Sequence, residues 1–468
     1  MADNIREIVL DTLLELEKGG EYSHRLIRAV LDKYDYFDSR DKSFIKRLAE
    51  GTIERQIELD YDLDHISSLP VQKMKSLIRC LLRMSAYQLL YMDTVPDSAV
   101  CNEAVKLAGK RGFRNLQGFV NAVLRNLSKQ KGTIPLPDAQ KEPERYLSVK
   151  YSMPVWLVGL WLSEYGREVT ERILSGLMRV HPVSVRFSSG LSEQEREDRV
   201  AQLARAGVKV TQSPCLPYVY SMEHGDNISV LPGFAEGVFT VQDASSALAV
   251  EAAEIRDTDL VMDICAAPGG KSILAAEKAY KVLARDVSIE KTDVIEENIR
   301  RMGAENIEVQ VFDATEFDSR YEEKADVVLM DVPCSGLGVM GRKRDIKYRV
   351  TPEGLKDLAQ LQRRIVDSSW RYVKPGGTLI YSTCTIHSEE NEAMVRYISE
   401  NLPFEPVSLE NVLPSMLWER KREMGAGKGQ ALLTEKQQAA CIQLLPGYME
   451  CDGFFFARFR RKKCEKNF

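Results

Sequence analysis

Residues 260–271 read Leu-Val-Met-Asp-Ile-Cys-Ala-Ala-Pro-Gly-Gly-Lys. A short apolar run that ends in an acidic residue and leads into a glycine pair is typical of a buried strand followed by a tight turn and a helix. Gly269 and Gly270 permit that turn and let backbone N–H groups approach a ligand. The stretch therefore predicts the first strand and the ligand loop of an open α/β sheet.

Further short β-rich runs follow, separated by segments of helical pattern. The five runs are 260–264, 282–284, 307–312, 327–330 and 378–382. Strands that alternate with helices are typical of a doubly wound parallel sheet. We expect this α/β domain to occupy residues 236–468.

The rest of the chain divides into three parts. Residues 1–130 show apolar residues at helical spacing and predict an all-helical domain. Residues 131–150 contain Gly132 and three prolines without periodicity and predict a linker. Residues 151–235 alternate helical and extended patterns, with a capping box at Ser192-x-x-Glu195, and predict a small α+β module.

Composition bounds the class of protein. The 468 residues carry 64 Lys and Arg against 69 Asp and Glu, a net charge of −5, and 44% are hydrophobic. These values exclude a disordered, collagen-like or disulfide-scaffold protein. The chain lacks a signal-like start and any uncharged apolar run near the ~20 residues of a membrane helix. We expect a soluble, cytoplasmic protein with no membrane partner.

The nine cysteines form no Cys-x-x-Cys pair and lie near no cluster of histidines. This spacing argues against structural zinc and, in a reducing cytosol, against disulfides. We expect no metal site, and any special cysteine to be a nucleophile.

Basic residues gather in three places. One cluster falls within 101–131, one within 342–349, and one within the last thirteen residues. A single cluster is usually a solvated face, but three of them favour a polyanionic partner such as nucleic acid.

Acidic residues follow four successive predicted strands: Asp263, Asp286, Asp313 and Asp331. In an open α/β sheet, ligands bind at the carboxyl ends of the strands. Asp286 lies about twenty residues after the glycine loop, the position from which a carboxylate accepts hydrogen bonds from a ribose diol. The run around Gly269 and Gly270 matches neither of the two common phosphate-binding patterns, G-x-x-x-x-G-K-[ST] and G-x-G-x-x-G. Four carboxylates suit a cationic nucleoside cofactor, and S-adenosyl-L-methionine, a sulfonium without phosphate, fits that charge.

Two cysteines, Cys334 and Cys384, fall on the same side of the predicted sheet. A single strand-end cysteine is usually a small buried hydrophobe. Carbon 5 of a pyrimidine, however, is too electron-poor to accept a methyl group until a thiolate has added to carbon 6. One cysteine that attacks and a second polar group that assists release form a chemically sensible set.

The motifs resemble a known family. Cys265-Ala-Ala-Pro-Gly-Gly-Lys271, Asp331-Val-Pro-Cys-Ser-Gly-Leu-Gly338 and Tyr381-Ser-Thr-Cys-Thr385 are similar to those of RNA cytosine-5 methyltransferases, the NOL/NOP/Sun family. Val95-Pro96, the run Asn102-Glu-Ala-Val105 and the run Phe119-Val-Asn-Ala-Val-Leu-Arg125 resemble a NusB-like RNA-binding domain. The pairing, over nearly the whole chain, resembles the 16S rRNA branch of that family.

The resemblance implies a class I S-adenosylmethionine-dependent methyltransferase (Rossmann-like) fold behind an all-α NusB-like domain. It makes Cys384 the nucleophile and Cys334 the cysteine that aids release, with Asp331 beside the target base. Its cofactor positions correspond to Cys265, Ala266, Ala267, Pro268, Gly269, Gly270, Lys271, Asp286, Asp313 and Asp331. The implied partner is 16S ribosomal RNA or a small-subunit assembly intermediate, in which one cytidine is methylated at carbon 5. We expect the enzyme to be a monomer.

Three alternatives stay open at this point. The same chemistry on tRNA is one, because fold resemblance does not determine the substrate. A nucleotide-linked oxidoreductase is another, which the missing G-x-G-x-x-G run and the paired cysteines disfavour. The third is a non-catalytic RNA-binding ribosome assembly factor, a class that normally loses a nucleophile or a cofactor acid.

Overall fold

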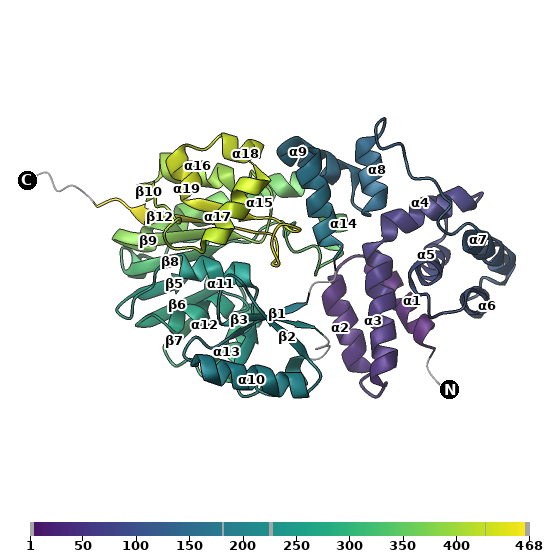
Figure 1. Cartoon of the computed structure of the whole chain (residues 1–468), viewed down its shortest axis with the longest axis horizontal. Helices are drawn as coiled ribbons and strands as arrows, with labels where there is room; N and C mark the ends of the chain where they lie inside the picture. Colours follow the sequence, from purple (N-terminus) through teal and green to yellow (C-terminus); the bar gives the residue numbers. More distant parts are fainter. Residues whose placement is uncertain (1–3, 180–181, 224–227, 426, 464–468) are drawn as a thin grey trace, which may run out of the picture. The chain divides into compact units, whose positions relative to one another are not determined.

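The computed structural model describes residues 4–179, 182–223, 228–425 and 427–463. The chain forms two compact units (Figure 1). The first comprises residues 1–163 together with 342–349, and the second comprises 164–341 with 350–468. A segment from the second half of the sequence therefore belongs to the first unit.

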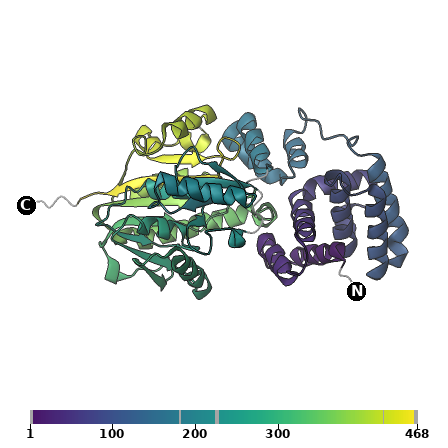
Figure 2. The same ribbon diagram turned by 60° about the horizontal axis from the view of Figure 1, so that its bottom comes forward.

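The first unit is a helical bundle, and Figure 2 shows its N-terminal residues up to 163 in purple to blue. Its helices are α1 (Ile5–Glu17), α2 (Ser23–Lys33), α3 (Ser39–Glu54), α4 (Gln56–Ile66), α5 (Ser76–Tyr91), α6 (Asp97–Lys110), α7 (Gln117–Lys129), α8 (Pro143–Lys150) and α14 (Ile346–Arg349). Leu10, Leu48, Leu81 and Leu124 are fully buried at its centre, which confirms the helical pattern predicted for 1–130. The second half of the predicted linker is helical, because Pro143 takes the first turn of α8, where a missing N–H costs nothing.

Residues 342–349 are built into this bundle. The Arg344 guanidinium donates to a Glu54 carboxylate oxygen at 2.9 Å and also pairs with Glu50. The buried ammonium of Lys347 donates to the Glu54 carbonyl at 2.7 Å and to the Ser152 carbonyl at 2.6 Å. Burying these cations costs hydration free energy, and only such hydrogen-bond partners offset that cost. The segment is therefore a fixed part of the bundle.

The second unit begins within helix α9 (Val155–Leu177), whose regular dihedrals are interrupted at Gly166. A four-stranded antiparallel sheet follows, in the order β2-β3-β1-β4. Its strands are β1 (Val183–Phe187), β2 (Lys209–Gln212), β3 (Val219–Glu223) and β4 (Phe239–Val241), and helix α10 (Glu193–Arg205) lies between β1 and β2 in the chain. The predicted capping box is present, because Ser192 and Glu195 exchange both hydrogen bonds.

The larger sheet of this unit runs in the order β10-β12-β9-β8-β5-β6-β7, with β11 paired to β12. Its strands are β5 (Leu260–Asp263), β6 (Lys281–Asp286), β7 (Ile307–Val311), β8 (Ala325–Asp331), β9 (Val373–Thr383), β10 (Phe404–Pro406), β11 (Cys441–Leu444) and β12 (Phe454–Arg461). Strands β5 to β9 pair in parallel, which confirms the five predicted strands. The antiparallel strands β10 to β12 are an addition that the strand-helix alternation did not predict.

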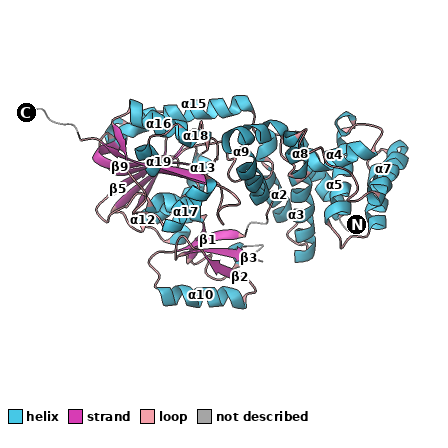
Figure 3. Cartoon of the chain, turned by 45° about the horizontal axis from the view of Figure 1, so that its top comes forward, coloured by secondary structure: helices cyan, strands magenta, loops and turns pink. Residues whose placement is uncertain are grey.

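Helices cover both faces of this sheet (Figure 3). On one face, side chains such as Val261 and Leu329 pack with α11 (Ala244–Glu251), α12 (Gly270–Ala276) and α17 (Ser415–Met424). On the other, their neighbours Met262 and Met330 pack with α15 (Pro352–Ser369) and α16 (Glu392–Asn401). Successive strand residues point to opposite faces, so two buried faces require the continuous apolar runs that the sequence shows. Helices α13 (Ile289–Met302), α18 (Lys428–Ala431) and α19 (Glu435–Ala439) complete the unit.

Candidate functional site

The glycine loop joins β5 to α12. Gly269 precedes the first residue of α12 with φ +101°, a left-handed conformation that a side chain disfavours, and a Cβ there would lie 3.3 Å from Ile295. The Gly269 N–H donates to the Ala266 carbonyl at 2.7 Å, which closes the turn. Asn298 donates to the Pro268 carbonyl at 3.0 Å. The predicted loop residues therefore form one tight turn at the carboxyl end of the first strand.

Asp286, at the end of β6, lies against this loop. Its carboxylate accepts from the backbone N–H groups of Ala267 at 2.9 Å and Val287 at 2.8 Å, and from the Lys291 ammonium at 2.9 Å. The side chain is buried, so these donors stabilise its charge. The structure thus brings together two predicted cofactor elements, the loop and the acid of the second strand.

Asp263, at the end of β5, is only 1% exposed. One carboxylate oxygen accepts from Ser272 Oγ at 2.6 Å, while Oδ1 has no hydrogen-bond partner among the described residues. Burial raises the pKa of Asp263 to about 6, against the lowering effect of the Ser272 hydroxyl. A buried acceptor without a donor is costly, so a ligand that donates here would be stabilised.

Asp331, at the end of β8, links three strand ends. Its Oδ2 accepts from Lys271 Nζ at 2.6 Å and its Oδ1 accepts from Ser382 Oγ at 2.8 Å. Burial alone would lower the pKa of Lys271, but the Asp331 carboxylate and its hydrogen bond raise it above its ordinary value. Lys271 therefore stays charged in a largely buried position.

Cys334 and Cys384 face each other. Their Sγ atoms are 3.2 Å apart, although fifty residues separate them in sequence. Neither lies in a disulfide bond, and the same holds for Cys80, Cys101, Cys215, Cys265, Cys441 and Cys451. The hydrogen bond with the Cys384 sulfur, burial, and the carboxylates of Glu390 and Asp331 hold the pKa of Cys334 well above its ordinary value. At neutral pH Cys334 therefore keeps its proton.

Asp313 lies at the outer edge of this arrangement, whereas Cys265 lies among its acids. Asp313 is exposed after β7, and its carboxylate accepts from the N–H and the hydroxyl of Thr315, both at 2.8 Å. The backbone bond from Thr315 lowers the pKa of Asp313. Burial raises the pKa of the Cys265 thiol, with further increases from nearby acids that include Asp286 and Asp331. Cys265 is thus a protonated thiol beside the acids, rather than a nucleophile.

The structure divides the basic clusters into paired and unpaired cations. In the cluster at 101–131, four cations lie in ion pairs whose acids mostly come from outside that stretch: Lys106–Glu103, Lys110–Glu7, Arg111–Glu7, Arg111–Asp11 and Lys131–Asp97. Arg114, Arg125 and Lys129 are exposed. In the cluster at 342–349, Arg344, Lys347 and Arg349 bond to the bundle. Near the C-terminus, Arg458 and Arg461 are buried and paired with Glu254 and Glu323. Lys466 lies outside the described residues. The sequence overstated the basic surface because acids distant in sequence pair with it.

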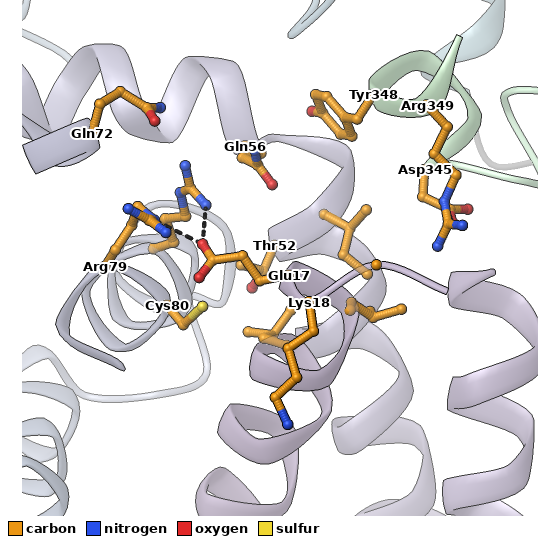
Figure 4. A pocket seen from close by; sticks show the side chains of 15 residues that line it. Glu17, Lys18, Thr52, Gln56, Gln72, Arg79, Cys80, Asp345, Tyr348 and Arg349 are labelled. Atoms are coloured by element: carbon orange, nitrogen blue, oxygen red, sulfur yellow. Dashed lines mark hydrogen bonds and ion pairs between the residues drawn. The ribbon is translucent and has the colours of Figure 1, made fainter. Parts of the chain in front are cut away.

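A separate cavity of about 480 Å³ lies within the helical unit (Figure 4). Glu17 projects into it from α1 and pairs with Arg79 at 2.7 Å and with Arg83 at 3.4 Å. Tyr348 and Arg349 of the inserted segment line its other side. The Glu17 carboxylate and the two arginines of this cavity therefore neutralise one another. Asp263, by contrast, has a buried oxygen without a hydrogen-bond donor among the described residues.

Two other kinds of feature are absent from the part of the chain that the structure describes. No group of three or more His, Cys, Asp or Glu among these residues is arranged to hold a metal ion. Within the same residues, no helix combines the length and the apolarity needed to cross a membrane.

Several residues near the site were not assigned by the sequence analysis. Ser382 stands two positions before Cys384 and bonds Asp331. Glu390 is fully buried behind Cys334 and bonds Ser335. The signal for Glu390 was the acidic run that follows the second cysteine, which as a sequence is also typical of a solvated turn.

Comparisons with known proteins agree over the whole chain. Residues 250–460 match the family described as "16S rRNA methyltransferase RsmB/F", and residues 3–129 match the "NusB family". The "Probable ribosomal RNA small subunit methyltransferase B" of Bacillus subtilis (strain 168) is 34% identical over 467 residues, which cover 98% of this chain and 99% of that relative. The "Ribosomal RNA small subunit methyltransferase B" of Salmonella arizonae is 30% identical with the same coverage.

Solved structures match the fold. The structure titled "Crystal Structure of PH0851" has a TM-score of 0.77 at 23% identity, covering 98% of this chain and 100% of that one. The structure titled "The crystal structure of NSun6 from Pyrococcus horikoshii with SFG" has a TM-score of 0.53 at 20% identity, covering 66% of this chain and 98% of that one. The predicted class I methyltransferase fold behind a NusB-like helical domain is confirmed. The chain belongs to the RsmB/F family of 16S rRNA methyltransferases.

Proposed function

We propose that this protein methylates carbon 5 of a cytidine in 16S rRNA, with S-adenosyl-L-methionine as methyl donor and a covalent cysteine adduct as intermediate. The observation that carries the proposal is the 3.2 Å separation of the Cys334 and Cys384 sulfurs beside the Lys271–Asp331 pair. Family membership supports the rRNA substrate.

The strand-end residues fit the cofactor. The buried Asp263 Oδ1 has no partner among the described residues and would accept from a donor group of the ligand, and Asp286 stands where a ribose diol would bind. Val287 and Ile289, one and three residues after Asp286, leave 53% and 65% of their surfaces exposed, which an adenine ring would cover. The predicted loop from Cys265 to Lys271 would bound the ligand on one side, and Asp313 would be its outermost acid. When bound, the cofactor supplies an electrophilic methyl group.

The two thiols take different roles in the proposed reaction. The Cys384 thiolate adds to carbon 6 of cytosine, and the electron pair of the 5,6 double bond moves toward carbon 5, which then accepts the methyl group. A base removes the proton from carbon 5, the double bond re-forms, and the Cys384 thiolate leaves. Cys334 keeps its proton because of its surroundings, so it is suited to assist release rather than to attack.

Lys271 and Asp331 prepare the surroundings of these thiols. The ammonium of Lys271 neutralises Asp331 and lies close enough to Cys384 for a Cys384 thiolate to raise the pKa of Lys271 further. A cation near a thiolate stabilises it relative to the thiol. Asp331, held by Ser382, would lie beside the target base.

Replacing each cysteine tests the proposal. Cys384→Ala should form neither product nor adduct with rRNA, because the attacking group is missing. Cys334→Ala should attack and transfer the methyl group but release slowly, so that protein and RNA remain joined on a denaturing gel. An adduct with Cys384→Ala and none with Cys334→Ala would reverse the roles.

A mass-spectrometric search for 5-methylcytidine in the wild-type product identifies the modified atom. A methyl group on another base or atom would overturn the proposal. Transfer RNA offered as substrate in parallel should remain unmodified.

A further inference from the structure

A buried carboxylate lies behind the two cysteines. Glu390 belongs to the loop between β9 and α16, and its side chain has no exposed surface. It accepts hydrogen bonds from Ser335 N at 2.9 Å, from Ser335 Oγ at 2.5 Å and from Gln362 Nε2 at 2.9 Å. A buried charge persists only when donors compensate for lost water, so these donors and Glu390 hold one another in place.

These hydrogen bonds fix both neighbours of Cys334. Gln362 Nε2, while bonded to Glu390, also donates to the Pro333 carbonyl at 3.0 Å. Ser335, on the other side of Cys334, is bound by Glu390 through its N–H and its hydroxyl. One carboxylate therefore restrains the residue before and the residue after the thiol.

The same group reaches the loop of the second cysteine. Ser335 Oγ lies 2.7 Å from Oγ1 of Thr385, the residue after Cys384. A serine hydroxyl has one hydrogen, and Ser335 donates it to Glu390, so Thr385 is the donor to Ser335. A chain of hydrogen bonds from Glu390 through Ser335 to Thr385 thus connects the two cysteine loops.

Glu390 is itself held from the sheet. Tyr381 Oη, on β9, donates to the Glu390 carbonyl at 2.7 Å and lies 3.2 Å from Gln362 Oε1. Both Tyr381 and Gln362 are fully buried. The carboxylate is therefore anchored on rigid elements, the condition for holding other groups to within a fraction of an ångström.

We propose that Glu390 is a positioning residue that sets the distance between Cys334 and Cys384 by holding the residues that flank them, an inference that rests on the function proposed above. Its carboxylate is hydrogen-bonded to Ser335 and Gln362 and lies 3.4 Å from His387 Nδ1, so Glu390 acts through these neighbouring side chains rather than on the substrate. Its charge adds to the groups that keep the Cys334 proton in place.

The first test measures the thiol pair without RNA or cofactor. A thiol oxidant such as diamide should join Cys334 to Cys384 quickly in the wild type, because their sulfurs already lie 3.2 Å apart. In Glu390→Ala the rate of this cross-link should fall about tenfold or more, since even a 1 Å displacement disrupts such geometry. Cross-linking of a folded Glu390→Ala at the wild-type rate would overturn the proposal.

Two further variants separate positioning from bulk stability. Glu390→Gln should cross-link at close to the wild-type rate, because the amide oxygen accepts from Ser335 N and Gln362 while the amide NH₂ donates to Ser335 Oγ. Glu392→Ala is the matched control: a carboxylate two residues away, also buried, in the same unit. It should lower the melting temperature and leave the cross-linking rate unchanged. Equal slowing by Glu392→Ala and Glu390→Ala would show a merely structural role.

The second test uses the reaction. Glu390→Ala should lower kcat for methyl transfer about 10²-fold while the KM for rRNA changes little, because chemistry and not docking is displaced. A proportional rise in KM at unchanged kcat would contradict positioning. If Glu390→Ala does not fold, Ser335→Ala, which removes the link to Thr385, should slow both reactions, and wild-type behaviour would overturn the inference. Absence of 5-methylcytidine in the wild-type product would refute the proposed function, whereas the cross-linking result tests Glu390 independently.

Discussion

Lys271 Nζ lies 2.6 Å from Asp331 Oδ2, an ion pair that joins the glycine loop after β5 to the end of β8. The two side chains are 15% and 26% exposed, so water screens the pair only partly. The ammonium also lies 5.4 Å from the centre of the Phe454 ring on β12. Three strands of the sheet thus position one cation beside the cysteines.

Removing that cation should slow the reaction more than it weakens RNA binding. We expect Lys271→Met to lower the rate of methyl transfer roughly 10²- to 10³-fold, the usual effect of losing one fixed electrostatic group. Single-turnover kinetics with labelled cofactor measures it. Lys278→Met, which breaks the Lys278–Glu251 pair elsewhere in the unit, is the control and should leave the rate unchanged. A change of only a few fold in Lys271→Met would remove Lys271 from the mechanism.

Asp286 should contribute to cofactor affinity. We expect Asp286→Ala to cost roughly 1–3 kcal/mol of S-adenosylmethionine binding, because donors of the ligand and of the loop lose their acceptor. Isothermal titration calorimetry measures the change. Asp313→Ala should have a smaller effect, since Asp313 is exposed and bonded to Thr315. Unchanged binding in Asp286→Ala would refute the ribose assignment.

RNA binding by the helical unit should involve its exposed cations. Replacing Arg125 and Lys129 with Gln should weaken rRNA binding and reduce the slope of log affinity against log salt by roughly 0.7–0.9 for each phosphate that the variant no longer neutralises. Filter binding at several salt concentrations provides the slope. Lys110→Gln is the comparison, because Lys110 already pairs with Glu7 at 2.6 Å. Equal slopes for the double variant and the wild type would place the RNA-binding surface elsewhere.

Glu392 should make stability depend on pH. Burial raises the pKa of Glu392 to about 7, and its Oε2 has no hydrogen-bond partner among the described residues. The folded state therefore retains a proton that the unfolded state has lost, so stability falls as pH rises from the ordinary value near 4.5 to about 7. We expect Glu392→Gln to be more stable than the wild type above pH 7 by about 1–3 kcal/mol, with little gain near pH 4. Urea unfolding at pH 4 and pH 8 measures the difference, and an equal gain at both pH values would contradict the assignment.

The sheet and its ligand loop could be predicted because their signals are local. Strand-length apolar runs, Gly269 and the terminal acids each restrict the nearby backbone on their own. Asp331 and Asp286 could be placed near the loop from topology alone, since parallel strands bring their carboxyl ends to one edge. Strand β12 was not predicted as part of this sheet, because antiparallel pairing with β9 depends on partners that sequence spacing does not reveal.

The partners of charged residues were the part that sequence did not reveal. The basic run at 342–349 favoured a polyanion, but Arg344 pairs with Glu50 and Glu54, about 290 residues away. In the sequence, Glu390 is one of several acids that follow the second cysteine, a pattern typical of a solvated turn. It is buried instead, because Ser335 and Gln362 donate hydrogen bonds to its carboxylate. Charge along a chain shows the amount of basic or acidic surface only after distant partners have been assigned.

The insertion of residues 342–349 into the helical bundle has a consequence for the order in which the protein forms during translation. The Ser23 N–H and hydroxyl donate to Asp345 at 2.9 and 2.7 Å, so the N-terminal bundle lacks these partners until the ribosome has passed residue 349. Synthesis from residue 163 to residue 349 is 186 residues, which takes roughly 10–40 s at about 5–20 residues per second. During that interval the nascent bundle exposes the surface that the segment later covers. The helical domain therefore completes its packing only after the ribosome has built the strand and loop that carry Cys334.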